Sequence, residues 1–364
     1  MYEKYFGLSS NPFSMTPDPS MLFMTPTHRE ALAGLAYAIL ERKGFVALTG
    51  EAGTGKTSLL ARTLTVLPKT RVVSSVILNP SLSEKEFLEM MLLDFGFRDV
   101  PESKARRLVA FQEFLLKTQA AGQIAVLVVD EAHKLSPSML EEVRLLSNLE
   151  FPGTKLLQIV LAGQPELIEV LSRPDLRQLN QRVSVRLSIG LLKPSEVPRY
   201  IALRWSKSAA TQPPFSEGCY GEISNWSRGI PRLVNSICDN ALMLAFAETS
   251  PLVNPSHVVE ACKDLSLSDP GSRHYYGGAA AQPPLAGPTF NASANVSAAP
   301  GANGTSLRSA LEERPINTTA APLRVPTPPP IPADKGPDAK PSFWQRWMAR
   351  RRETPARSSL GEVQ

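Results

Sequence analysis

Gly50-Glu51-Ala52-Gly53-Thr54-Gly55-Lys56-Thr57 is the stretch that decides the fold of this chain. The apolar run 45–49 precedes it, and the helix-forming segment 58–64 follows it. The pattern G-x-x-x-x-G-K-T binds phosphate when it forms the loop between a strand and a helix. The sequence therefore predicts a site for a nucleoside triphosphate. The alternative is a plain glycine turn with a solvated lysine.

Each part of this loop has an expected task. Backbone N–H groups of the turn and the helix N-terminus bind phosphate oxygens, and Lys56 reaches the β- and γ-phosphates. The Thr57 hydroxyl binds Mg²⁺. The expected nucleotide contacts from this loop are Gly50, Glu51, Ala52, Gly53, Thr54, Gly55, Lys56, Thr57 and Ser58.

Two carboxylates follow the most apolar run, residues 124–129, which is apolar at every position. Such runs are typical of central strands buried on both faces. Asp130 and Glu131 then stand at the carboxyl end of a strand, the edge of an open α/β sheet where ligands bind. We expect Asp130 to hold Mg²⁺ and Glu131 to polarise the attacking water. The alternative is a pair of acids that favour a helix start.

His133 completes the tetrapeptide Asp130-Glu131-Ala132-His133, which is also the second motif of one helicase class. That class needs a second sheet domain to grip nucleic acid. A chain of 364 residues with a long tail of low complexity has no room for one. We therefore exclude a helicase and expect His133 to be an ordinary polar residue at a helix start.

Strand and helix patterns alternate over the first half of the chain, which predicts a parallel five-stranded α/β sheet with helices on both faces. The strands are expected at 45–49, 71–78, 124–129, 156–162 and 183–189, and the helices at 28–42, 58–67, 83–95, 103–121 and 137–149. Thr27 with Glu30, and Ser83 with Glu86, read as capping boxes, and Ser136 reads as an N-cap.

After Pro194 the pattern is wholly helical, at about 195–209, 216–227, 231–248 and 255–264. We expect a nucleotide-binding domain over 1–192, whose first 27 residues form a linker, and a small helical lid over 193–265. Fourteen of the 33 prolines fall between Pro270 and Pro341, so residues 266–364 are expected to be a disordered tail.

Charge and cysteines narrow the class of protein. The tail from residue 265 holds 11 of the 39 basic and 7 of the 34 acidic residues, which leaves 28 against 27 for the rest. This near-neutral balance shows no strongly basic footprint for nucleic acid. Cys219, Cys238 and Cys262 lack metal-like spacing and are expected as buried free thiols. With no signal peptide and no long apolar run, we expect a cytoplasmic protein.

The order of the motifs resembles the AAA+ superfamily and, within it, the general secretion pathway protein A (ExeA-like) ATPases. Besides the two motifs above, the resemblance is carried by Leu161-Ala162-Gly163-Gln164-Pro165-Glu166-Leu167, Leu176-Arg177-Gln178-Leu179-Asn180-Gln181-Arg182, Gly229-Ile230-Pro231-Arg232-Leu233 and the opening residues 1–19. It covers about residues 1–264 and implies an ATP hydrolase that uses Mg²⁺.

Several residue roles follow from the resemblance. Gln164 matches the sensor-1 position, which orients water or contacts the γ-phosphate. Arg182 matches the arginine finger, which enters the site of a neighbouring subunit and stabilises charge on the phosphoryl oxygens; Arg177 is the competing candidate. Arg232 matches sensor 2. The aromatic residues of segment 5–13 either lie near the adenine or pin the N-terminus to the core.

The partners implied are other copies of the chain and an unknown protein, in envelope secretion or export. Family members can carry a transmembrane helix and a periplasmic domain after the ATPase. Here only a Pro-rich linker and the basic aromatic segment 343–352 follow, which either touches an anionic inner-membrane surface or is solvated. The alternatives are a DNA-associated ATPase, which the neutral core disfavours, and a slow nucleotide switch that scaffolds partners.

Overall fold

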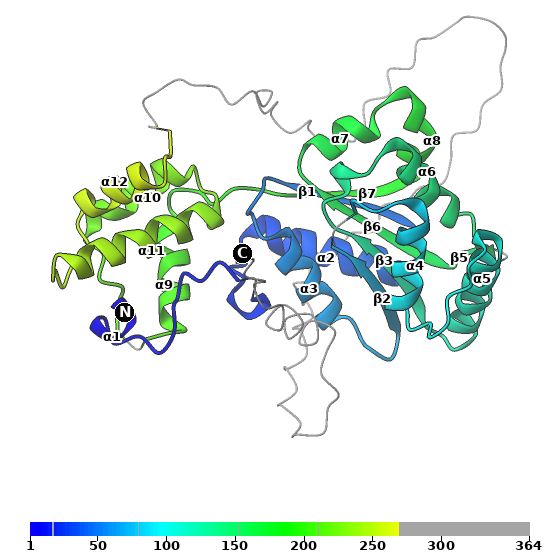
Figure 1. The fold of residues 1–364 in the computed structure, drawn as a ribbon, viewed down its shortest axis with the longest axis horizontal. Helices are drawn as coiled ribbons and strands as arrows, with labels where there is room; N and C mark the ends of the chain where they lie inside the picture. The colour runs from blue at the N-terminus through cyan, green and yellow to red at the C-terminus, as the bar shows by residue number, and fades with distance from the viewer. Residues whose placement is uncertain (17, 79, 152, 210, 269–364) are drawn as a thin grey trace, which may run out of the picture. The chain divides into compact units, whose positions relative to one another are not determined.

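A computed structural model describes residues 1–268 except residues 17, 79, 152 and 210. The expected tail from residue 269 onward, with segment 343–352, lies outside the described residues. Five parallel strands form one sheet in the order β2-β3-β6-β1-β7 (Figure 1). They are β1 (Phe45–Gly50), β2 (Val72–Ile77), β3 (Ile124–Val129), β6 (Leu157–Gly163) and β7 (Val183–Ile189). The expected five-stranded parallel sheet is confirmed.

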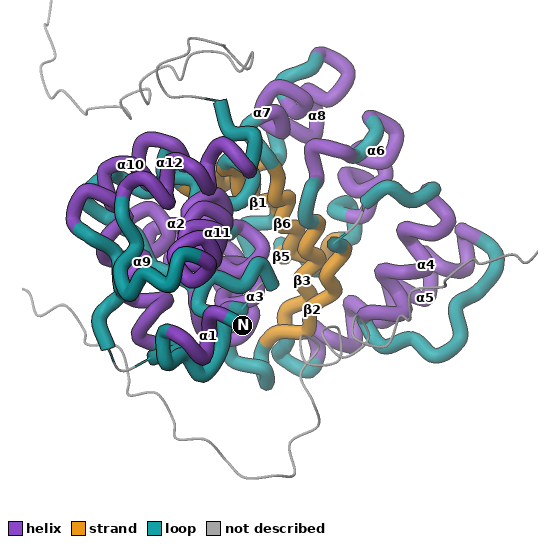
Figure 2. The backbone as a smooth tube through the Cα atoms, turned by 60° about the vertical axis from the view of Figure 1, so that its left-hand side comes forward, coloured by secondary structure: helices purple, strands orange, loops and turns teal. Residues whose placement is uncertain are grey.

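Helices cover both faces of the sheet, with α2 and α3 on one side and α4 and α5 on the other (Figure 2). They are α2 (Pro26–Leu40), α3 (Lys56–Val66), α4 (Glu84–Asp94), α5 (Lys104–Ala120), α6 (Pro137–Leu146), α7 (Glu166–Leu171) and α8 (Arg177–Asn180). Apolar side chains of α4, α5 and α6 pack with those of Ala47, Leu127 and Ile159 in one large cluster. Strands β1, β3 and β6 are buried along their whole length because both their faces are covered.

Four helices after the sheet surround a second hydrophobic cluster. They are α9 (Val197–Ser206), α10 (Glu217–Ser227), α11 (Pro231–Ala247) and α12 (Pro255–Asp264). Tyr2, from the short helix α1 (Tyr2–Tyr5), packs in this cluster with Leu8 and Phe13. The Arg204 side chain donates to the carbonyl oxygens of Pro12 (2.7 Å) and Ser14 (3.0 Å). The beginning of the chain is therefore fastened to these helices.

Two of the three helix caps that the sequence predicts are present in the structure. The capping box of Ser83 with Glu86 is present, and Ser136 caps α6 ahead of Pro137. The predicted cap at Thr27 is wrong, because α2 begins at Pro26 and Thr25 is its N-cap. Proline is preset for the first helical position, which moves the cap to the residue before it.

The remaining elements are short. The three-residue helices η1 (Pro19–Met21), η2 (Ala132–Lys134) and η3 (Pro174–Leu176) connect longer elements, and β4 (Glu150–Phe151) pairs with β5 (Thr154–Lys155). The sequence pattern does not predict these elements, nor does it predict α1, α7 and α8. Such elements are only two to six residues long, which leaves too few positions for an apolar period to be recognised.

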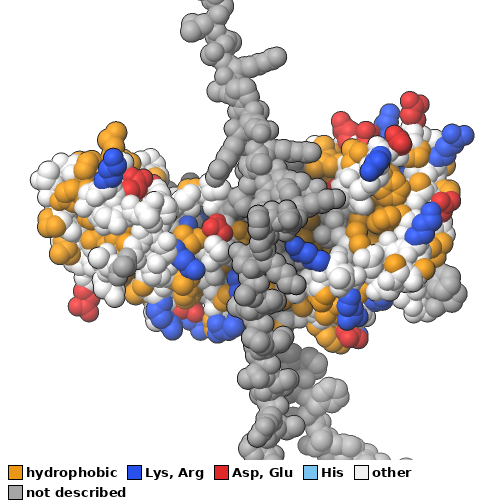
Figure 3. Space-filling view, turned by 90° about the horizontal axis from the view of Figure 1, so that it is seen from below, with side chains coloured by type: hydrophobic (Ala, Val, Ile, Leu, Met, Phe, Trp, Pro, Cys, Tyr) orange, Lys and Arg blue, Asp and Glu red, His pale blue; other side chains and the backbone are white. Residues whose placement is uncertain are grey.

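The three cysteines are buried free thiols, as expected. Burial raises the pKa of the Cys238 thiol, and it raises the pKa of Cys262 to about 12. Within the described ranges, none of the helices combines the length and the apolar character that crossing a bilayer requires. The face drawn in Figure 3 carries acidic, basic and hydrophobic side chains.

Candidate functional site

The phosphate-binding loop has the backbone that its glycines allow. Gly53 and Gly55 have φ values of +79° and +98°, in the left-handed region that favours glycine. Gly55 is also the N-cap of α3, so the loop leads directly into the helix N-terminus. The free backbone N–H groups of a first helical turn attract anions. The loop therefore has the geometry of an anion-binding site.

Lys56 lies inside this loop. Its side chain is buried, and Nζ donates to the carbonyl oxygens of Gly50 (2.7 Å) and Glu51 (3.0 Å). Burial lowers the pKa of Lys56, while the negative charges of Asp130 and Glu131 act in the opposite direction. An anion bound in the loop would further favour the charged ammonium, because opposite charges at short range stabilise each other.

Thr57 and Asp130 are 73 positions apart in the sequence, yet the Thr57 hydroxyl donates to Asp130 Oδ2 at 2.5 Å. Asp130 is buried, which raises its pKa, and the hydrogen bonds from Thr57 and from the Glu131 N–H oppose that rise. A hydroxyl and a carboxylate fit Mg²⁺, which prefers oxygen ligands and keeps several of its waters. Thr57 and Asp130 are thus the residues that would hold the ion.

Glu131 adopts a backbone conformation that is uncommon for a residue with a side chain, with φ of +54°. Such conformations cost about 1–3 kcal/mol and are concentrated at functional sites. The Glu131 N–H donates to Asp130 Oδ1 at 2.9 Å. Its Oε2 lies 3.3 Å from Lys134 Nζ and 3.6 Å from His133 Nε2. The chain therefore turns sharply just after β3. As a result, the Asp130 carboxylate contacts Thr57, whereas the Glu131 carboxylate faces His133 and Lys134.

Gln164 follows β6, the strand that lies between β1 and β3. The strand order therefore places Gln164 between the phosphate-binding loop and Asp130, at the same edge of the sheet. Its backbone N–H donates to His133 Nδ1 at 3.3 Å, and its side-chain amide lies 3.1 Å from His133 Nε2. The predicted sensor residue is thus tied to His133, which was expected to be an ordinary polar residue.

The three arginines stand in different surroundings. Arg182 is partly buried and donates to Ser147 Oγ at 2.7 Å, at the end of α6. Arg177 is exposed, and none of the hydrogen bonds or ion pairs among the described residues involves its side chain. Arg232, near the start of α11, lies against the loop, since a Cβ added at Gly53 would be 2.6 Å from Arg232 Cβ. Arg232 is therefore the arginine that contacts the phosphate-binding loop.

Segment 22–28 also reaches the loop, a contact that no sequence pattern predicts. His28 is buried, and its Nε2 lies 3.0 Å from the carbonyl oxygen of Thr54. Burial is the main reason why the pKa of His28 is lowered. By contrast, Tyr5 packs against Phe246 and Phe13 packs against Phe215. These contacts favour the interpretation that the aromatic residues of segment 5–13 pin the N-terminus.

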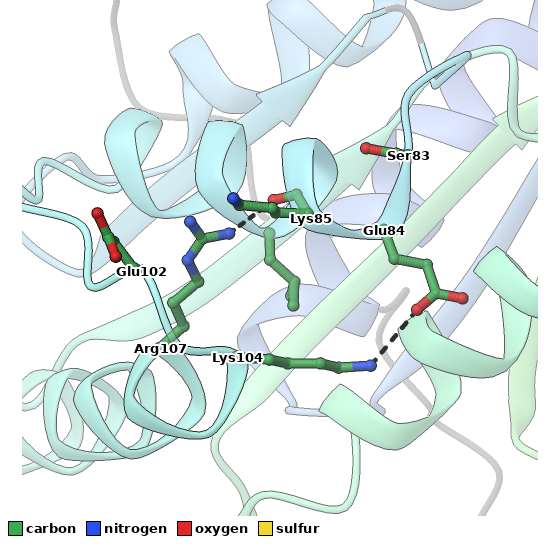
Figure 4. A pocket seen from close by; sticks show the side chains of 7 residues that line it. Ser83, Glu84, Lys85, Glu102, Lys104 and Arg107 are labelled. Carbon is green, nitrogen blue, oxygen red and sulfur yellow. Dashed lines mark hydrogen bonds and ion pairs between the residues drawn. The ribbon is translucent and has the colours of Figure 1, made fainter.

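A pocket between α4 and α5 carries no functional assignment (Figure 4). Lys104, which lines it, pairs with Glu84 and Glu142. Arg107 donates to the carbonyl oxygens of Pro101 and Lys85. Both of these cations therefore have partners within the protein.

Comparisons with known proteins identify the family of the domain that carries this site. Residues 39–171 match a family model described as an AAA domain. General secretion pathway protein A of Aeromonas hydrophila is 41% identical over 274 residues, which are 75% of this chain and 50% of that protein. The chain therefore spans about half the length of the curated relative that it matches.

Solved structures agree on the fold. The Aeropyrum pernix ORC2 protein, solved in ADPNP–ADP complexes, gives a TM-score of 0.55 at 16% identity and covers 71% of this chain and 73% of its own. Cdc6p from Pyrobaculum aerophilum gives a TM-score of 0.55 at 16% identity and covers 71% of each chain. At this identity the similarity concerns the fold alone. The chain thus contains an AAA domain with the P-loop NTPase fold, and it resembles general secretion pathway protein A.

Proposed function

We propose that this protein binds ATP with Mg²⁺ and hydrolyses the bond to the γ-phosphate. The observation that carries the proposal is the contact between Thr57 and Asp130, with Lys56 and Gln164 at the same edge of the sheet. These are the groups that a phosphoryl-transfer site needs: a cation, metal ligands and a polar residue beside the attacking water. No such set is expected from a glycine turn that only begins a helix.

Each residue then has one task. The loop N–H groups and Lys56 bind and orient the phosphates, and Glu131 accepts a proton from the attacking water. Gln164 orients that water, and Arg232 contacts the nucleotide from α11. Mg²⁺, held by Thr57 and Asp130, neutralises charge on the phosphate oxygens when it is bound.

Steady-state hydrolysis tests the proposal directly. Phosphate release by the purified full chain is expected to require both ATP and Mg²⁺ and to stop when EDTA is added.

We also propose that the site is completed by a second copy of the chain. The rate per subunit is therefore expected to rise with protein concentration. A rate per subunit that stays constant over a hundredfold dilution range would contradict a shared site.

The finger assignment gives a sharper prediction. Arg182→Ala is expected to lower turnover about 10³-fold or more, since an arginine finger contributes 10³ to 10⁵ in rate. Arg177→Ala is the matched comparison, because Arg177 is exposed and lies five positions earlier. The reverse ranking would transfer the role to Arg177.

Mixing two inactive variants tests whether the finger acts between subunits. A Glu131→Gln subunit keeps its arginine finger, and an Arg182→Ala subunit keeps its base. Where the two meet, the base of the Arg182→Ala subunit can therefore be completed by the finger of the Glu131→Gln subunit. Turnover is expected to reappear in the mixture, whereas each variant alone stays inactive. A mixture as inactive as its components would argue that Arg182 acts within its own subunit.

We further propose that hydrolysis drives or gates a partner in envelope secretion or export. Support comes from the name of the Aeromonas hydrophila relative and from the 41% identity to it. Comparing the material exported by cells with the wild-type gene and by cells with Lys56→Ala tests this role. Identical export in both strains would contradict it.

A further inference from the structure

His133 stands between the two residues that are expected to act on the attacking water. Its ring contacts Gln164 through both nitrogens, at 3.3 Å from Nδ1 and 3.1 Å from Nε2. Its Nε2 is also 3.6 Å from Glu131 Oε2. The side chain is only 12% exposed, so water competes weakly for these contacts. One imidazole ring therefore connects the end of β3 to the end of β6.

The contacts determine which ring nitrogen carries hydrogen. A backbone N–H can only donate, so the N–H of Gln164 requires Nδ1 of His133 to accept. A neutral ring then carries its hydrogen on Nε2, facing the Gln164 amide and the Glu131 carboxylate. The amide accepts this hydrogen when its oxygen faces the ring, an orientation reached by an amide flip.

The close approach of the two strand ends depends on a glycine. A Cβ added at Gly163 would lie 3.2 Å from both the backbone nitrogen and Nδ1 of His133. That separation is tighter than nine in ten real Cβ contacts, so a side chain at this position would push the neighbouring atoms away by a few tenths of an ångström. Helix η2 can therefore lie against the end of β6 because residue 163 has no side chain.

An ordinary helix-start residue would behave differently. Polar residues at helix starts usually bond to free N–H groups of their own helix. The His133 ring instead bonds to residue 164, which follows a different strand. Its contacts are therefore those of a link between elements and not those of a cap.

We propose that His133 is a positioning residue that holds Gln164 and Glu131 in fixed relation to each other, so that both address the same water. The proposal rests on the proposed hydrolysis of ATP. The ring acts through these two neighbours.

Kinetics of His133 variants provide the first test. His133→Ala is expected to lower kcat about 10- to 100-fold, the usual effect of losing a group that orients a reacting one. The KM and the dissociation constant for ATP should change by less than about twofold, because phosphate binding uses other residues. His133→Asn, whose amide oxygen replaces Nδ1, should recover part of the loss.

His257 offers a matched control outside the site. Its Nδ1 accepts from the Asn254 N–H at 3.0 Å, and its Nε2 lies 2.9 Å from Glu248 Oε2. Like His133, it accepts a backbone N–H at Nδ1 and faces a carboxylate with Nε2, but here the ring belongs to the capping box of its own helix, α12. His257→Ala should therefore lower the unfolding temperature but leave kcat unchanged. An equal loss of kcat in both variants would assign His133 a merely structural role.

A double-mutant comparison shows whether His133 acts through its neighbour. If the ring works by holding Gln164, then His133→Ala should lower kcat less than about threefold in a Gln164→Ala background. If the two substitutions lowered kcat independently, so that their separate effects multiplied in the double variant, the proposal would be overturned. A wild-type kcat in His133→Ala would also overturn it.

The hydrogen on Nε2 can be observed without turnover. The chain has four histidines, so selective ¹⁵N labelling gives few ring signals, and His133→Gln identifies the one of interest. We expect a neutral ring with hydrogen on Nε2, and a shifted signal in Gln164→Ala. Hydrogen on Nδ1 would refute the contact. A wild-type chain with this ring state but no turnover would refute the proposed hydrolysis and leave the link intact.

Discussion

Replacing Glu131 with glutamine is expected to lower the rate of ATP hydrolysis about 10²- to 10⁴-fold, the usual contribution of a general base. Glutamine has nearly the same shape as glutamate but cannot accept the proton of the attacking water. The variant should still bind ATP, because Lys56 and the loop N–H groups remain. Phosphate release measures the loss of turnover. Equilibrium binding of a fluorescent ATP analogue, measured on the same preparation, shows whether binding is retained.

Glu169→Gln is the matched control for this variant. Glu169 is an exposed acid on α7, close in sequence to Gln164 but pointing into solvent. The same loss of one negative charge at this position should leave turnover unchanged. If Glu131→Gln hydrolysed ATP at the wild-type rate, Glu131 would not be the base. A loss of binding as large as the loss of turnover would indicate damage to the site itself.

Replacing Lys56 with alanine is expected to weaken ATP binding about 10- to 100-fold, and turnover would fall with it. The ammonium is already desolvated inside the loop, so its attraction for phosphate is not offset by a further loss of hydration. Hydrogen bonds to charged groups contribute about 1.5–3 kcal/mol, which corresponds to this range of affinity. Titration calorimetry with ATP and Mg²⁺ measures the change.

Lys69→Ala provides the comparison, because Lys69 is an exposed lysine shortly after α3. It removes the same charge from the surface, where the effect on a distant ligand is screened by salt. Lys56→Ala should keep its secondary structure and unfold cooperatively, which circular dichroism can follow. Wild-type affinity in this variant would show that the nucleotide does not bind in this loop.

Much of the fold could be predicted because its signals are local. Residues 124–129 and 183–189 were expected as strands and have those bounds in the structure. Runs of apolar and β-branched residues, ended by turn residues, identify such strands. The cap of α2 was misplaced because Pro26 competes with the capping-box pattern that begins at Thr27. The short α7 and α8 carried no recognisable period.

The sequence by itself determined which residues form the two motifs, since loop glycines, Lys56, Thr57 and the carboxylates after β3 are identified by type and spacing. It did not determine which strand lies between β1 and β3. That order brings β6 beside β3, and with it Gln164 beside His133. Hydrogen bonds between the ends of neighbouring strands join residues far apart in the chain. Local periodicity carries no information about such bonds, so only the tertiary structure decided which residues the His133 ring contacts.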